Sequence, residues 1–254
     1  MRIEHDRGVS KLLRSIEEEH LAGGFSFTEG PIWIPWDNCL LFTDIPNNRI
    51  HRWRPGMNHA EVYREPSRHA NGLTLDHDGQ LLACEHSGRR VSRGAYNEAE
   101  VTLVDRFDGQ RFNSPNDIVV HSSGAIYFTD PDYGLRDPRW INPDDPNPQQ
   151  ETPFFGVYRL APDGSLTVVA SDFSGPNGLA FSPDEAVLYI GDSRDKFIKR
   201  FRVAADGSLE DEVMFADQRD DERRGGPPAP GAFLSTPRRA TSSSTSKWPN
   251  TPLI

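Results

Sequence analysis

The feature that most constrains the fold is a strand–turn–strand pattern that recurs four times along the chain, beginning near residues 28, 69, 114 and 175. Each copy opens with a polar corner, continues as an alternating apolar strand, turns tightly and ends in a second strand, which predicts a hairpin. The corner residues are Glu29, Asn71, Asn116 and Asn177. The expected turns are Asp78-Gly79, Ser123-Gly124 and Pro183-Asp184.

The spacing of the corners identifies the class of fold. Glu29 and Asn71 are 42 positions apart, Asn71 and Asn116 are 45 apart, and Asn177 follows after 61 more. The last interval contains a polar, proline-rich segment, residues 134–153, which we expect to be a loop. Hairpins with a period of about 40–50 residues predict a β-propeller, whose four-stranded blades surround a channel. The equivalent corners of all blades would then meet at that channel.

Charge and apolar content limit the classes of function. The 254 residues include 28 Lys and Arg against 38 Asp and Glu, a formal net charge of −10, which argues against a nucleic-acid partner. No apolar run reaches signal-peptide or membrane-span length, so we expect a cytoplasmic protein with no membrane partner. Cys39 and Cys84 each lie in an apolar run, and we expect buried free thiols, with a disulfide as the alternative.

The chain divides into three segments. We expect residues 1–20 to form an N-terminal helical or extended segment, in which 9–20 have the pattern of a short amphipathic helix. Residues 21–222 carry the propeller blades. In residues 223–254 acidic residues and alternating strands are absent, and Pro, Ser, Thr and Arg dominate, so we expect a disordered or aberrant tail. A shifted reading frame is one hypothesis for this change in composition.

The corners suggest a metal site. Glu29 lies in an apolar and aromatic run, where a carboxylate needs a positive or hydrogen-bonding partner. Glu carboxylate and Asn carbonyl oxygens are hard ligands that suit Ca²⁺, Mg²⁺ or Mn²⁺. The alternative is that Asn-Gly and Asn-Asp only mark turns, because Asn tolerates a left-handed backbone. Three asparagines and a glutamate at equivalent corners favour the metal site.

Other polar residues fit structural roles. Asp44, Asp130 and Asp192 each end an apolar strand, and this repetition favours capping of turns over catalysis. His69 could line the channel, with a structural role as the alternative. The pair Arg89-Arg90 is expected at a solvated strand end, with contact to an acidic product as the alternative. No G-x-S-x-G motif is present, so the sequence gives no support for a covalent serine mechanism.

Several motifs resemble one known family. The stretches FTEGPIW, FNSPNDIVVHSSGAIYFTDPDYG and GPNGLAFSPDEAVLY are similar to those of SMP-30/gluconolactonase/luciferin-regenerating-enzyme-like proteins, and the resemblance spans roughly residues 25–222. It implies an all-β, six-bladed propeller with a divalent metal in its channel, most often Ca²⁺, with Mg²⁺, Mn²⁺ or Zn²⁺ as alternatives. Many members hydrolyse small sugar lactones such as gluconolactone.

The resemblance also implies roles for individual residues. By motif, Glu29 and Asn177 match metal ligands, and Asn116 matches a residue that contacts metal or substrate. We accordingly expect Glu29, Asn116 and Asn177 to bind metal, and Asn116, Asn71 and His69 to bind substrate. A metal of this kind would polarise the lactone carbonyl while a carboxylate activates water.

The chain departs from the family pattern near its end. The family continues with a D-G motif whose Asp completes the metal set and serves as the general base, and this motif is absent here. The catalytic base is therefore unassigned, and the last blade is expected to be incomplete. Poor stability and weak or absent lactonase activity are expected. Two alternatives stay open: organophosphate-ester hydrolysis at the same ion, and a non-catalytic propeller scaffold. The sequence leaves the specific lactone and the oligomeric state undetermined.

Overall fold

A computed structural model describes residues 19–142 and 144–217. The helix expected at 9–20 lies outside these residues except for 19 and 20, which are not helical, and the tail at 223–254 lies wholly outside them. The regular secondary structure of the described residues is almost entirely antiparallel strand, arranged as four sheets of four strands and one short two-stranded ribbon.

Each sheet is a meander in which consecutive strands pair in chain order. The first sheet contains β1 (Thr28–Ile34), β2 (Cys39–Asp44), β3 (Arg49–Trp53) and β4 (Glu61–Arg64). The second contains β5 (Ala70–Leu75), β6 (Leu81–Glu85), β7 (Arg90–Gly94) and β8 (Val101–Val104). The third contains β11 (Ile118–Val120), β12 (Ile126–Asp130), β13 (Phe155–Leu160) and β14 (Leu166–Phe173). The fourth contains β15 (Pro176–Phe181), β16 (Val187–Asp192), β17 (Phe197–Val203) and β18 (Leu209–Asp217).

Three short elements complete the described chain. β9 (Arg106–Phe107) pairs with β10 (Gln110–Arg111), and α2 (Tyr133–Arg136) follows β12. The expectation of a loop throughout residues 134–153 is therefore wrong at its start, because residues 134–136 belong to α2. We call residues 131–142 and 144–154, which connect β12 to β13, the covering segment.

The predicted hairpin turns are confirmed. The backbone N–H of Gly79 donates to the carbonyl of Asp76, and the N–H of Gly124 donates to the carbonyl of His121. These bonds close the turns between β5 and β6 and between β11 and β12. Gly79 and Gly124 have positive φ angles of 74° and 86°, which glycine adopts without the steric cost that a side chain adds.

The apolar core lies between neighbouring sheets. One cluster joins the first and second sheets, another joins the second and third, and another joins the third and fourth. In the cluster between the second and third sheets, Phe128 and Tyr158 stack with ring centroids 5.3 Å apart. Full burial of one such side chain stabilises the fold by about 1.5–3 kcal/mol. Cys39 and Cys84 are buried and free, as expected.

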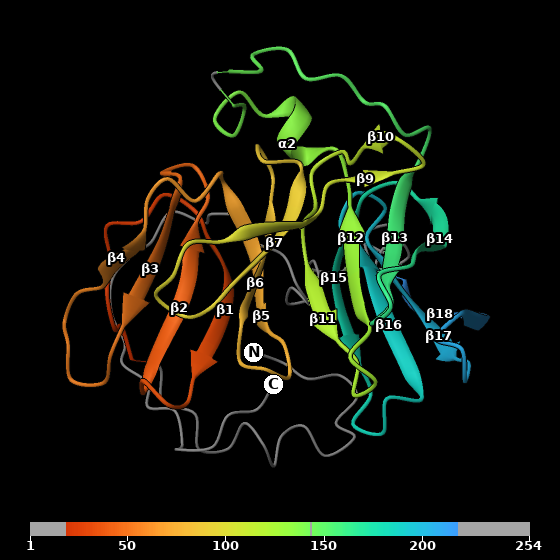
Figure 1. Cartoon of the computed structure of the whole chain (residues 1–254), viewed down its shortest axis with the longest axis horizontal. Helices are drawn as coiled ribbons and strands as arrows, with labels where there is room; N and C mark the ends of the chain where they lie inside the picture. The colour runs from red at the N-terminus through yellow and green to blue at the C-terminus, as the bar shows by residue number, and fades with distance from the viewer. Residues whose placement is uncertain (1–18, 143, 218–254) are drawn as a thin grey trace, which may run out of the picture.

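The first strand of every sheet lies on the inside of the assembly. β1 contacts β5, β5 contacts β11, and β11 contacts β15, so the sheets follow one another like blades (Figure 1). Figure 1 also shows α2 and the covering segment together beyond one end of the sheets. An all-β propeller is thereby confirmed, and four of its blades lie within residues 19–217. In this part of the chain no helix has the length and apolar character needed to span a membrane.

Candidate functional site

The predicted corner residues all lie at the beginnings of the inner strands. Glu29 is the second residue of β1, Asn71 the second of β5 and Asn177 the second of β15, while Asn116 lies two residues before β11. The structure thus places the four corners on neighbouring inner strands at the same end of the sheets.

Glycine allows these strands to approach closely. A Cβ on Gly30, whose φ is 53°, would lie 2.1 Å from the carbonyl oxygen of Asn71. A Cβ on Gly72 would lie 2.7 Å from the carbonyl oxygen of Asn116, which accepts a hydrogen bond of 2.7 Å from the Gly72 N–H. A side chain at either position would collide with the backbone of the next sheet. The glycine after each of these two corners therefore keeps Glu29, Asn71 and Asn116 on closely spaced strands.

His86 brings two of the corner side chains together. This fully buried residue follows the last residue of β6, and its Nε2 lies 3.3 Å from Nδ2 of Asn71 and 3.4 Å from Nδ2 of Asn116. Both amides donate to the same ring nitrogen, so their Oδ1 atoms are directed away from the ring. No described residue donates a hydrogen bond to either Oδ1.

The His86 ring is kept neutral by its surroundings. Burial lowers the pKa of His86 to about 3, and the nearby His69 lowers it further, against a smaller opposing effect of Asp137. A neutral imidazole has one acceptor nitrogen, which matches the two donating amides at Nε2. Its Nδ1 is buried without a hydrogen-bond partner among the described residues. Trp140 from the covering segment packs on this ring, with centroids 5.3 Å apart.

Glu29 contributes negative charge to the same region. Burial raises the pKa of Asp117 to about 6, and the charge of Glu29 adds to that rise, while hydrogen bonds from the N–H groups of Ile118 and Leu179 oppose it. Asp117 is only partly covered, yet the inner strands around it limit its hydration. Its two oxygens accept from Ile118 at 2.9 Å and Leu179 at 3.2 Å, which joins β11 to β15.

Asn177 and His69 differ in their side-chain contacts. The Asn177 carbonyl accepts a hydrogen bond of 2.9 Å from Thr129, while its side-chain amide bonds to no described residue. His69 is buried, and its Nδ1 lies 2.9 Å from the Ser87 hydroxyl oxygen. His69 therefore has a structural partner within the second sheet. Whether it also contacts substrate stays a prediction.

The strand-end acids have the capping role expected from sequence. Oxygens of Asp44 accept from the backbone N–H groups of Ser26 and Phe27 at 3.1 and 3.2 Å. Asp192 accepts from the N–H groups of Ser174 and Gly175 at 2.7 and 2.9 Å, and from two N–H groups that follow it. These acids hold the chain that leads into β1 and β15.

The prediction for Arg89 is wrong. Its side chain is buried rather than solvated, because Nε donates to the Phe112 carbonyl at 2.6 Å and Nη2 donates to the Gln149 carbonyl at 3.0 Å. Arg89 thereby fixes the covering segment to the second and third sheets. Arg90 instead pairs with the buried Glu85, at 2.6 Å.

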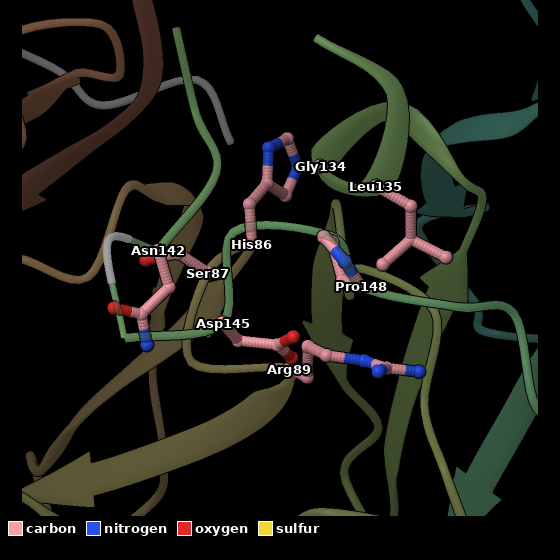
Figure 2. Close-up of a pocket in the computed structure, with 8 residues that line it drawn as sticks. All are labelled: His86, Ser87, Arg89, Gly134, Leu135, Asn142, Asp145 and Pro148. Atoms are coloured by element: carbon pink, nitrogen blue, oxygen red, sulfur yellow. The ribbon is translucent and has the colours of Figure 1, made fainter. Parts of the chain in front are cut away.

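A small pocket separates the covering segment from the turn after β6 (Figure 2). The residues that line it are His86, Ser87, Arg89, Gly134, Leu135, Asn142, Asp145 and Pro148. It borders His86 and so adjoins the corner residues. Its lining includes His86 and Ser87, which contact predicted site residues, but none of the predicted residues themselves, so the pocket adjoins the predicted site and is not the site itself.

The donors at the corners fit a hard cation. Amide oxygens that accept no hydrogen bond from described residues are available as ligands, and Glu29 supplies a carboxylate. Among residues 19–142 and 144–217 there is no cluster of three or more His, Cys, Asp or Glu side chains arranged to hold a metal. The predicted set has a single acidic member, Glu29, and two asparagines. A site built mainly from amide oxygens is not a cluster of this kind.

Sequence reasoning missed His86 and Trp140. His86 stands in ACEHSG directly after the strand-end acid Glu85, and its proximity to a recurring strand end is the signal that the sequence offers. Trp140 lies in a segment with no strand pattern, and only the fold places it against His86. Its signal in the sequence is a single aromatic residue within a polar, proline-rich segment.

Comparisons with known proteins bear on the family and the fold. The chain is 36% identical over 189 residues to the gluconolactonase of Zymomonas mobilis, which covers 69% of this chain and 51% of that protein. A solved gluconolactonase from Xanthomonas campestris superposes with a TM-score of 0.72 at 36% identity, covering 78% of this chain and 65% of that one. The calcium-binding protein regucalcin from Agrobacterium tumefaciens, at 19% identity and a TM-score of 0.60, shows likeness of fold alone.

The described relatives are longer than the matched part of this chain, which spans about half the length of the curated relatives it matches. A family model described as "SMP-30/Gluconolactonase/LRE-like region" matches residues 27–231, which include all four blades and every corner residue. The chain belongs to the SMP-30/gluconolactonase/LRE-like family.

Proposed function

We propose that this protein hydrolyses a small sugar lactone with a divalent cation held by Glu29, Asn116 and Asn177. The observation that carries the proposal is the arrangement around His86. Two buried amides, those of Asn71 and Asn116, donate to one ring nitrogen and direct their oxygens away from it, beside the strand that carries Glu29. Such preorientation of oxygen donors is typical of a ligand site.

The residues have distinct roles in this proposal. Glu29 provides the one full negative charge, while the neutral amides of Asn116 and Asn177 leave net positive charge at the cation. Ca²⁺ is the first expectation, with Mg²⁺, Mn²⁺ or Zn²⁺ as alternatives. When bound, such an ion supplies a Lewis acid that polarises the lactone carbonyl. Asn71 and His69 would orient the substrate, and the residue that accepts the proton of the attacking water is unassigned.

The relatives support lactones as the substrate class. The proteins that this chain resembles include a gluconolactonase from Zymomonas mobilis and a pentonolactonase from Haloferax volcanii, at 36% and 29% identity. The chain covers only 51–52% of each of these relatives, so lactone hydrolysis by this chain is a proposal that their activity supports. The net charge of −10 supports a small-molecule partner rather than a nucleic acid, and a cytoplasmic location is part of the same proposal.

The blade count belongs to the proposal as well. Residues 21–222 are proposed as the propeller region, and the structure describes four blades within it. The matched part of this chain covers 65% of the solved Xanthomonas campestris relative. Blades of similar size throughout that relative would number about six, within the common range for propellers. We propose six blades for the complete fold, of which the structure describes four.

The test is an assay of lactone hydrolysis with the metal removed and then added back. Protein stripped with a chelator is assayed with gluconolactone, with spontaneous hydrolysis subtracted, before and after addition of Ca²⁺, Mg²⁺, Mn²⁺ or Zn²⁺. We expect turnover that returns with at least one of these ions and is largely lost in Glu29→Gln. Metal-independent turnover, or none with any ion, would contradict the proposal.

A further inference from the structure

Trp140 lies beside the corner residues but belongs to a different part of the chain. Its ring centroid is 5.3 Å from that of His86 and 6.2 Å from that of Phe27, two residues before Glu29. His86 in turn contacts Asn71 and Asn116. The indole therefore bridges the entrance to β1 and the residue that orients the two amides.

The indole has an unused hydrogen-bond donor. Its Nε1 is buried, yet it bonds to no described residue. The neighbouring His86 Nδ1 is also buried without a partner among those residues. Native proteins satisfy most buried polar groups, and those left unsatisfied call for a specific explanation. Two such nitrogens lie on rings whose centroids are 5.3 Å apart, which makes this place a candidate site for a hydrogen-bond acceptor.

The covering segment is held in place by contacts to three sheets. The Gly134 N–H donates to the Ser114 hydroxyl at 2.9 Å, and the Tyr133 hydroxyl donates to the Gly175 carbonyl at 3.2 Å. Arg89 holds the later part through the Gln149 carbonyl. Anchors on both sides of Trp140 give the indole a defined position, as a binding surface requires.

We propose that Trp140, together with Phe27, forms a subsite that binds the ring of a polyhydroxylated lactone, with the indole Nε1 donating to a substrate oxygen. The inference rests on the proposed function and deepens it, because it assigns recognition of the hydroxyl groups of the substrate to one residue. An indole offers an apolar face to the C–H groups of a sugar ring and a donor at its edge. Trp140 is a specificity-determining residue here and takes no part in bond cleavage.

Substrate comparison separates this role from simple packing. Trp140→Phe keeps an aromatic ring and removes the donor, and it is assayed with gluconolactone and with δ-valerolactone, which lacks hydroxyls. We expect KM for gluconolactone to rise about tenfold, the loss of one hydrogen bond, with kcat and the valerolactone parameters within about twofold. Trp36→Phe, at an exposed turn between β1 and β2, is the matched control and should change neither substrate.

Two results would overturn the subsite. An equal change with both lactones would mean that Trp140 only supports the structure, and no change with either would mean that it does not contact substrate. If Trp140→Phe unfolds, wild-type protein with ¹⁵N-labelled tryptophan gives a direct readout from its five indole signals. Addition of gluconate should shift one indole N–H signal, and an unchanged spectrum would refute the subsite.

The proposed function and the subsite can fail separately. If the wild-type protein hydrolyses neither lactone, the proposed function is wrong, and the subsite is then judged by gluconate binding in calorimetry. Weaker binding by Trp140→Phe than by wild type would still support the subsite. Equal binding, or no binding to the wild type, would overturn it.

Discussion

Two sets of polar residues recur once per blade at the same end of the sheets, and they differ in their hydrogen-bond partners. The strand-end acids are Asp44, Glu85, Asp130 and Asp192. The corner residues are Glu29, Asn71, Asn116 and Asn177. From sequence alone both sets are repeated polar residues beside apolar strands, so recurrence by itself does not separate a structural role from a functional one.

Hydrogen bonding separates Asp44 and Asp192 from Asn71 and Asn116. Asp192 accepts four backbone N–H groups, and Asp44 accepts two backbone groups and the side chain of Asn47. By contrast, the amide oxygens of Asn71 and Asn116 accept from no described residue. An acceptor that the described chain leaves available is a candidate ligand, whereas one that the backbone uses is part of the scaffold. Asp130 falls between the two sets, because its Oδ2 accepts from the Asn113 N–H at 2.8 Å while its buried Oδ1 has no partner among the described residues.

The largest expected effect is at the charged corner. Glu29→Gln keeps the size of the side chain and removes the full negative charge, so cation affinity and kcat/KM for a lactone should fall about 100-fold or more. Isothermal calorimetry and steady-state kinetics measure the two quantities. Glu61→Gln makes the same chemical change on the outer strand β4 of the same sheet and should alter cation affinity less than twofold. Equal losses in both variants would refute a special role for Glu29.

A smaller effect is expected at the residue that orients the amides. His86→Leu removes the nitrogen that accepts from Asn71 and Asn116, so cation affinity should weaken about 10–100-fold, as for other residues that position ligands. The buried His51, on β3, provides the control His51→Leu, for which affinity should stay within about twofold. Unchanged affinity in His86→Leu would show that the amides are oriented by other groups.

Within the fourth sheet, one member of each set can be compared directly. Asp192→Ala leaves four backbone N–H groups without their acceptor and should lower the free energy of unfolding by about 2–3 kcal/mol. Asn177→Ala removes an amide that bonds to no described residue and should cost less than about 0.5 kcal/mol while weakening cation binding. Urea denaturation measures both, and a reversed order of the two costs would contradict the assignment.

The smallest effect concerns the strand-end acid of the third blade. Burial raises the pKa of Asp130 to about 8, and Asp132 adds to the rise, while hydrogen bonds from Asn113 and Ser114 and the charge of Arg89 oppose it. Since this pKa lies above the unfolded value of about 3.9, the stabilisation by the bound proton is complete at low pH and is lost as pH rises toward 8.

Asp130→Asn cannot ionise and should therefore gain stability relative to wild type as pH rises. We expect a relative gain of about 1 kcal/mol or more between pH 5 and pH 8 in denaturation experiments. A relative stability of the two proteins that is constant with pH, or that falls as pH rises, would contradict this assignment. The pH dependence expected for Asp130 distinguishes it from Asp192, whose two oxygens are both bonded to N–H groups.

The repeating part of the molecule was predictable from sequence because it obeys local rules. Alternation and turn residues determine each hairpin, and the period of the corners predicts how the hairpins assemble. The inner strands bearing Glu29, Asn71 and Asn177 follow from that period.

The non-repeating contacts were not predictable in this way. His86 and Trp140 meet through a segment without strand periodicity, so nothing local in the sequence indicates their 5.3 Å approach. Arg89 looked like a solvated strand end because its two carbonyl acceptors come from distant segments. Local patterns determine the blades, whereas the cover over their ends depends on long-range contacts.

The central claim is that Glu29, Asn116 and Asn177 hold one divalent cation at the ends of the inner strands. Anomalous diffraction at the manganese edge from crystals grown with Mn²⁺ tests it most directly. The account predicts one strong peak within coordination distance, about 2.2 Å, of oxygens from all three side chains. No peak there, or a peak bound instead to Asp44, Asp130 or Asp192, would contradict it.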